Sequence, residues 1–76
     1  RSQNYNTAIS HYEIAVKLDN KNHEAYFGLA RSYYAIQNNQ QAASYMLKAT
    51  RNAPSAYDQQ RYRHKLAVLN QLSSAY

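Results

Sequence analysis

The side chains that could perform metal, acid–base or nucleophilic chemistry are few and lie far apart in this chain. The histidines show no spacing of three or four residues, which would place two metal ligands on one helical face; they are His11, His23 and His64. The acidic residues form no close carboxylate pair: Glu13, Asp19, Glu24 and Asp58. Cysteine is absent, which excludes disulfides, thiolate zinc sites and cysteine nucleophiles. We therefore expect no metal site and assign structural roles to the histidines.

The motifs that enzymes use to bind phosphate or to activate serine are also missing. Gly28 is the only glycine, so the chain has no glycine-rich phosphate loop. The serines are not surrounded by the residues of a nucleophile elbow. The sequence therefore predicts a protein without catalytic activity and without a cofactor.

The charge balance permits several classes of binding partner and selects none of them. Nine basic and four acidic residues give a net charge of +5, which suits an acidic peptide, a nucleic acid or an anionic lipid. Tyrosine occurs nine times, beside one phenylalanine and no tryptophan. No apolar run approaches the roughly 20 residues of a membrane-spanning helix, so we expect no membrane insertion. Composition assigns no compartment, because the cytoplasm and the bacterial periplasm both fit it.

Helices must position these side chains, because glycine and proline each occur only once and helical periodicity is sustained along the chain. The 76 residues allow one small domain. Apolar and small residues recur at helical spacing over residues 4–18, 23–36 and 39–51, and a further helix begins after Ser55 and runs to about residue 74. Asn22, Asn38 and Ser55 precede three of these segments and are the expected N-caps. The sequence thus predicts an all-α fold of about four helices.

The two middle helices carry a regular pattern of large and small residues. The pattern consists of Tyr26, Leu29, Ala30 and Tyr33 on one helix, then Ala42, Met46 and Ala49 on the next, followed by Pro54. The small residues let two backbones approach closely, and the large ones fill the space between them. This order and spacing resembles the tetratricopeptide repeat, a helix pair of about 34 residues.

The resemblance implies antiparallel helix pairs stacked as part of a right-handed α-solenoid. A shift of 34 residues aligns the first helix with the third, since it carries Ala8 onto Ala42 and Ala15 onto Ala49. We accordingly divide the chain into residues 1–20, the second helix of a truncated repeat; residues 23–56, a complete repeat; and residues 57–76, a C-terminal capping helix or a divergent repeat. Because the chain begins at Arg1 rather than Met, we expect it to be a fragment.

The resemblance also implies a scaffold or adaptor function, because the first helix of each tetratricopeptide repeat lines a concave groove that commonly holds an extended peptide. The implied groove residues are Glu24, Phe27, Gly28, Arg31, Tyr34 and Ala35, and the last helix adds Arg61 and Lys65. Some family members clamp a peptide carboxylate, but a complete clamp is not supported, since Gly28 occupies its asparagine position. We expect Arg31, Arg61 and Lys65 to form a basic groove for an acidic protein segment.

Two other functions are compatible with the sequence. A nucleic-acid site would use neighbouring tyrosines for stacking on bases together with Arg31, Arg51, Arg61, Arg63 and Lys65. Homo-oligomerisation would pair the first helix with another copy, through the face that carries Ile9 and Val16.

The tyrosines divide into two groups by their positions in the repeat. The expected core positions are Tyr5, Tyr12, Tyr26 and Tyr33. The positions outside that set, and therefore the expected candidates for a partner surface, are Tyr34, Tyr45, Tyr57 and Tyr62.

Overall fold

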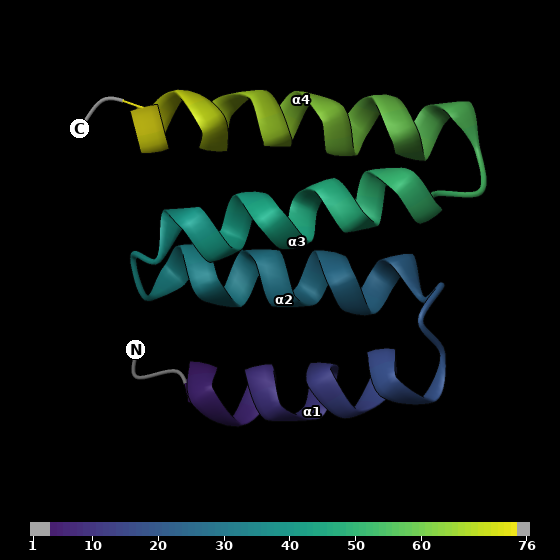
Figure 1. Ribbon diagram of the computed structural model, residues 1–76, viewed down its shortest axis with the longest axis vertical. Helices are drawn as coiled ribbons and strands as arrows, with labels where there is room; N and C mark the ends of the chain where they lie inside the picture. The colour runs from purple at the N-terminus through teal and green to yellow at the C-terminus, as the bar shows by residue number, and fades with distance from the viewer. Residues whose placement is uncertain (1–3, 75–76) are drawn as a thin grey trace.

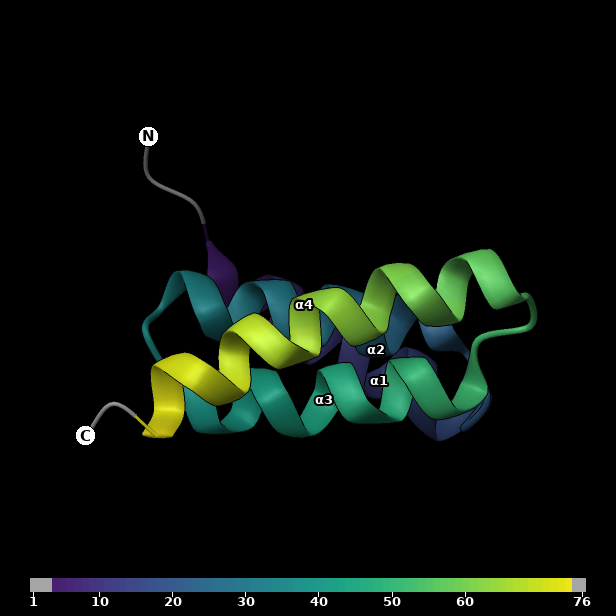
Figure 2. The same ribbon diagram turned by 90° about the horizontal axis from the view of Figure 1, so that it is seen from above.

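The computed structural model describes residues 4–74, which form helices packed side by side in chain order (Figure 1). The helices are α1 (Tyr5–Leu18), α2 (His23–Ala35), α3 (Asn39–Asn52) and α4 (Ala56–Ser74). Each helix packs against the one before it in the chain, and neighbours run antiparallel (Figure 1). Seen from above, α4 lies obliquely across α2 and α3 (Figure 2). The all-α prediction is confirmed, and each helix end lies within one residue of its predicted position.

Local hydrogen bonds explain why the helices begin where the sequence predicted. The side-chain oxygen of Asn22 accepts a hydrogen bond from the Ala25 amide at 3.1 Å. The side chain of Asn38 accepts one from the Gln41 amide at 3.2 Å. Each bond satisfies an amide that the first helical turn would otherwise leave unpaired.

Two further helix ends have equally specific causes. The hydroxyl of Ser55 accepts a hydrogen bond from the Asp58 amide at 3.1 Å, which starts α4. At the end of α2, Gln37 has a φ of 66°, and the amide of Asn38 donates to the Tyr33 carbonyl at 2.9 Å. This bond and this left-handed residue form a Schellman motif, which ends the helix and turns the chain toward α3.

The core lies between α2 and α3 and extends outward to α1 and α4. Its fully covered small residues are Ala30, Ala42 and Ala49, and its larger members include Leu29, Met46, Tyr26, Tyr62, Leu69 and Ile9. The complete burial of the three alanines fits the close approach of α2 and α3 that the pattern of small residues predicted. The core residues Tyr62 and Leu69 of α4 extend this core and help to hold α4 against α3.

The burial of several tyrosines differs from the prediction. Tyr62 is only 1% exposed, so its assignment to a partner surface was wrong; its ring packs against those of His23 and Phe27 on α2. Tyr12 was assigned to the core but is 36% exposed, and Tyr5 is only half-buried. Tyr45, another proposed surface residue, is half-buried and stacks on Tyr33 with 5.6 Å between ring centroids. Tertiary packing decides these outcomes, because every one of the rings lies on a helical face that contacts another helix.

The apolar side chains of α1 are only partly covered by the rest of the chain. Ile9 is buried and Val16 packs against the core, so both are occupied within the chain and are not free to pair with another copy. Leu18, in contrast, is 85% exposed at the last position of α1. On α4, Tyr62 and Leu69 are buried, and Leu66 and Leu72 are half-buried.

Candidate peptide-binding groove

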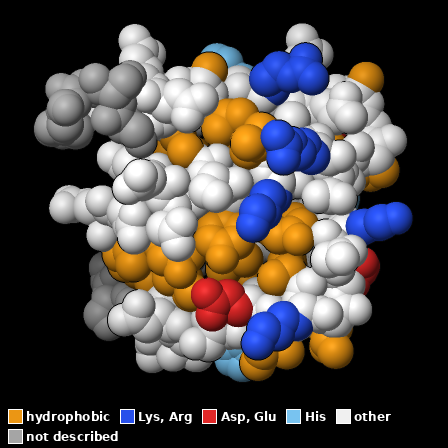
Figure 3. All heavy atoms as spheres, viewed as in Figure 1, with side chains coloured by type: hydrophobic (Ala, Val, Ile, Leu, Met, Phe, Trp, Pro, Cys, Tyr) orange, Lys and Arg blue, Asp and Glu red, His pale blue; other side chains and the backbone are white. Residues whose placement is uncertain are grey.

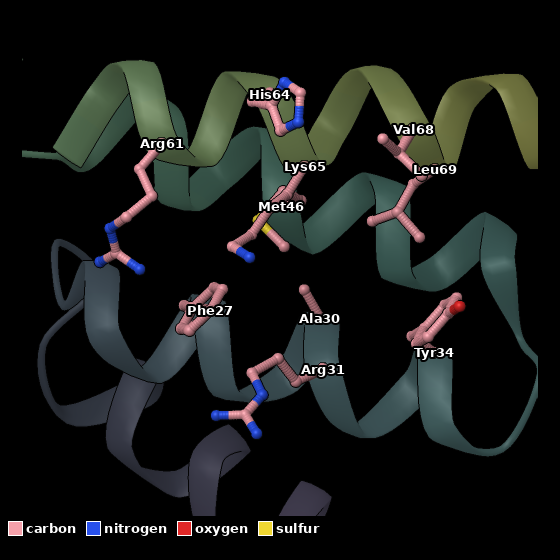
Figure 4. Close-up of a pocket in the computed structure, with 10 residues that line it drawn as sticks. All are labelled: Phe27, Ala30, Arg31, Tyr34, Met46, Arg61, His64, Lys65, Val68 and Leu69. Carbon is pink, nitrogen blue, oxygen red and sulfur yellow. The ribbon is translucent and has the colours of Figure 1, made fainter. Parts of the chain in front are cut away.

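A groove of about 630 Å³ runs between α2 and α4, over a floor supplied by α3 (Figure 4). Its lining residues are Phe27, Ala30, Arg31 and Tyr34 from α2; Met46 from α3; and Arg61, His64, Lys65, Val68 and Leu69 from α4. The predicted groove residues Phe27, Arg31, Tyr34, Arg61 and Lys65 therefore line one groove. Glu24 is exposed but does not line it.

The lining residues on the two walls of the groove occupy equivalent positions in the 34-residue repeat. Both α2 and α4 run antiparallel to α3 and thus parallel to each other (Figure 1). A shift of 34 residues carries Phe27, Arg31 and Tyr34 onto Arg61, Lys65 and Val68, and all six residues line the groove. Because residues three and four positions apart share a helical face, each helix presents one such row to the space between them.

At one end of the groove, the cationic end, three positively charged side chains surround a single aromatic ring. The ring centroid of Phe27 lies 5.7 Å from Cζ of Arg31, 5.5 Å from Cζ of Arg61 and 5.9 Å from Nζ of Lys65. These distances are within the range of cation–π attraction. The ring therefore helps to hold the cations of two helices close together despite their mutual repulsion.

Few carboxylates compensate this charge. Arg61 approaches Oδ1 of Asp58 at 3.4 Å, and this is the only ion pair within 4.0 Å among residues 4–74. Arg31 and Lys65 make no such pair within the described part of the chain. An acidic ligand could therefore approach these two cations without displacing a carboxylate of the protein itself.

The opposite end of the groove, the apolar end, is lined by exposed apolar side chains. Val68 of α4 is 47% exposed and Tyr34 of α2 is 52% exposed, and both lie at the opposite end from Arg61 in Figure 4. The buried side chain of Leu69 lies beside Val68 and continues this surface into the core. Val68 was not among the predicted groove residues, although its position 34 residues after Tyr34 was the signal that could have identified it.

Tyr62 holds the wall formed by α4 against the beginning of α2. Its hydroxyl and Nδ1 of His23 are 2.9 Å apart, within hydrogen-bond distance, and its ring lies against that of Phe27 with 5.2 Å between centroids. Burial raises the pKa of the Tyr62 phenol above its ordinary value, and the positive charge of Arg61 partly opposes this effect. His23 thus has the structural role that its isolated position in the sequence suggested.

A second groove, of about 550 Å³, lies between α1 and α2. It is lined by Asn4, Tyr5, Ala8, Tyr12, Gly28, Arg31, Ser32, Tyr34 and Ala35. The predicted groove residues Gly28 and Ala35 belong here and not to the groove beside α4. Arg31 and Tyr34 border both grooves, so they form the ridge between them.

The remaining basic residues proposed for nucleic-acid binding do not join this cluster. Arg51 and Arg63 are exposed and line neither groove. Lys and Arg side chains also occur on the face drawn in Figure 3. Positive charge is therefore not confined to the groove, where Arg31, Arg61 and Lys65 gather around Phe27.

Other chemical groups do not gather into a recognisable site in the described residues. No cluster of three or more His, Cys, Asp or Glu side chains that could hold a metal ion is found there. Within the same residues, every helix is too short or too polar to cross a bilayer.

Comparison with known proteins assigns the chain to a family. The model of the tetratricopeptide repeat family matches residues 1–69, which is most of the sequence. Searches of curated proteins and of solved structures found no match. The matched segment includes α1, α2, α3, most of α4 and the residues at both ends of the groove described above. The chain therefore belongs to the tetratricopeptide repeat family, whose members generally mediate protein–protein interactions.

Proposed function

We propose that this chain is an interaction module of a scaffold or adaptor, without catalysis of its own, that holds an extended acidic protein segment in the groove between α2 and α4. The observation that carries the proposal is the convergence of Arg31, Arg61 and Lys65 around Phe27 at 5.5–5.9 Å. Charge-assisted hydrogen bonds from such groups to carboxylates are stronger and shorter than neutral ones. Across a partly open groove they orient the ligand and accelerate association.

The experiment compares two variants that each lose three positive charges. In the groove variant Arg31, Arg61 and Lys65 become alanine, and in the control variant Lys17, Arg51 and Arg63 become alanine. All six residues are exposed, so both variants should retain the helical circular dichroism of the wild type. A fluorescent glutamate-rich peptide, measured by anisotropy, should bind the groove variant at least tenfold more weakly and the control variant within about twofold of wild type.

Three outcomes would count against the proposal. Equal losses in both variants would mean that net charge alone attracts the peptide, and unchanged affinity in the groove variant would remove the three cations from the site. Binding of single-stranded nucleic acid that is tight, steeply salt-dependent and reduced equally by both variants would favour the nucleic-acid alternative.

We propose further that α4 is a capping helix and not the start of another repeat. The α2 positions that pack toward α3 include Tyr26, Leu29, Ala30 and Tyr33, and a shift of 34 residues carries them onto Gln60, Arg63, His64 and Ala67. These four α4 residues are all exposed, and their mainly polar character suits the solvated end of a solenoid. Sedimentation equilibrium should give a mass independent of concentration, whereas a rising mass would favour homo-oligomerisation.

A further inference from the structure

The groove between α2 and α4 presents two different chemistries at a defined separation. Arg61 and Lys65 lie on α4 at the cationic end, and Val68 lies on the same helix at the apolar end (Figure 4). With a rise of about 1.5 Å per residue, Val68 lies about 10 Å beyond Arg61 and about 5 Å beyond Lys65 along the axis. The centre of the basic pair is therefore about 7–8 Å from the apolar end.

The opposite wall repeats this order. On α2, Phe27 marks the cationic end, Arg31 follows it, and Tyr34 lies beside the apolar end (Figure 4). Because α2 and α4 are parallel, the two walls change from cationic to apolar in the same direction. One part of an extended ligand in the groove thus contacts the positive charges, and another part contacts the exposed apolar surface.

We propose that the ligand of this groove carries a carboxylate and a bulky aliphatic side chain about two or three residues apart, because an extended chain advances roughly 3.3 Å per residue. The proposal rests on the function proposed above and adds a selectivity rule to it. The carboxylate pairs with Arg31, Arg61 and Lys65. The aliphatic side chain covers Val68 and Tyr34, which are 47% and 52% exposed in the free protein.

The two contacts contribute in different ways. Charge pairs at an open surface are screened by salt and fix orientation more than affinity. Removal of apolar surface from water is independent of that screening, and burying one aliphatic side chain is worth about tenfold or more in binding. Acidic character alone is therefore insufficient for tight binding, and the apolar residue decides which acidic segments are selected.

The test uses short fluorescein-labelled peptides of one length, made of the same residues except where leucine is replaced by alanine. In the four leading peptides, two adjacent glutamates are separated from one leucine by one or two serines, and the leucine lies either before or after the glutamates. In the comparison peptides the leucine directly adjoins the glutamates, lies at the far end of the peptide, or is replaced by alanine. Wild type should bind the best of the leading peptides about tenfold more tightly than the alanine peptide, and the misplaced leucines should recover little of this gain.

Two matched variants locate the apolar contact. Val68→Ser removes the exposed aliphatic side chain at the groove, and Ile14→Ser removes one that is 56% exposed on α1 and lines neither groove. Val68→Ser should abolish the preference for leucine, so that the leucine and alanine peptides bind this variant within about twofold of each other. Ile14→Ser should keep the full preference, because Ile14 is remote from the ligand.

The results separate this selectivity rule from the proposed function. If acidic peptides bind through Arg31, Arg61 and Lys65 with equal affinity whatever the position of leucine, the rule is wrong and the acidic groove stands. A leucine preference that persists in Val68→Ser also overturns the rule. If no glutamate-containing peptide binds, the proposed function itself fails, and the rule fails with it.

Discussion

Substituting alanine for Gly28 gives a sharp test of how α1 is seated on α2. Gly28 is buried in the middle of α2, and the ring of Tyr12 lies directly over it. A Cβ atom built on Gly28 would lie 2.6 Å from both Cε1 and Cε2 of that ring, well inside van der Waals contact. The side chain of Tyr12 therefore occupies the space that any larger residue at position 28 would need.

Two opposing contributions determine how Gly28→Ala changes the free energy of unfolding. Alanine is favoured over glycine in a helix interior by about 1 kcal/mol, which would stabilise the variant. Overpacking against Tyr12 costs roughly 1–3 kcal/mol. The lower part of that range applies, because the ring is 36% exposed and can swing toward solvent. The net result for Gly28→Ala should be a destabilisation of about 0–1 kcal/mol.

The decisive measurement is a double-mutant cycle followed by urea unfolding, with circular dichroism as the signal. In a Tyr12→Ala background the new methyl group meets no ring, so Gly28→Ala should stabilise the protein by about 1 kcal/mol. The two backgrounds should thus differ by about 1–2 kcal/mol in the effect of the same substitution. Stabilisation of about 1 kcal/mol in both backgrounds would show that Tyr12 does not rest on Gly28, and the packing of α1 deduced from it would be refuted.

The other predictions concern the centre of the core and the buried phenols. Ala42→Leu should destabilise the fold by roughly 1–3 kcal/mol, because Ala42 is fully buried where α3 meets α2; the exposed Ala67→Leu is its control, and equal melting curves for the two would contradict the assignment. Burial raises the pKa of Tyr45 and Tyr62 above the ordinary value of 10.0, so the unfolded chain releases these protons first and the free energy of unfolding should fall as pH rises above about 10. In urea unfolding between pH 9 and 11, the free energy of unfolding should fall less steeply with pH for a variant with phenylalanine at both positions. Identical slopes for the variant and the wild type would argue against the raised pKa values.

The helices and most of the groove residues were predictable because they depend on local features of the sequence. An Asn or Ser side chain caps a helix by bonding an amide three residues later, as at Asn22, Asn38 and Ser55, so neighbouring residues alone set these boundaries. The row Phe27, Arg31 and Tyr34 follows from helical spacing in the same way. The family resemblance supplied which face of α2 would be turned toward a ligand.

Burial and the composition of the whole groove depended instead on how distant helices meet. Tyr62 and Tyr34 have the same side chain, yet Tyr62 is buried against Phe27 and His23, while Tyr34 is left at the groove edge. Val68 became part of the site because its position brings it opposite Tyr34 across the groove. The sequence by itself determined the helices, their ends and the charged row on each. Only the tertiary structure decided that Tyr62 was covered and that Arg61 and Lys65 reached Phe27, because these outcomes arise from contacts between residues more than 30 positions apart.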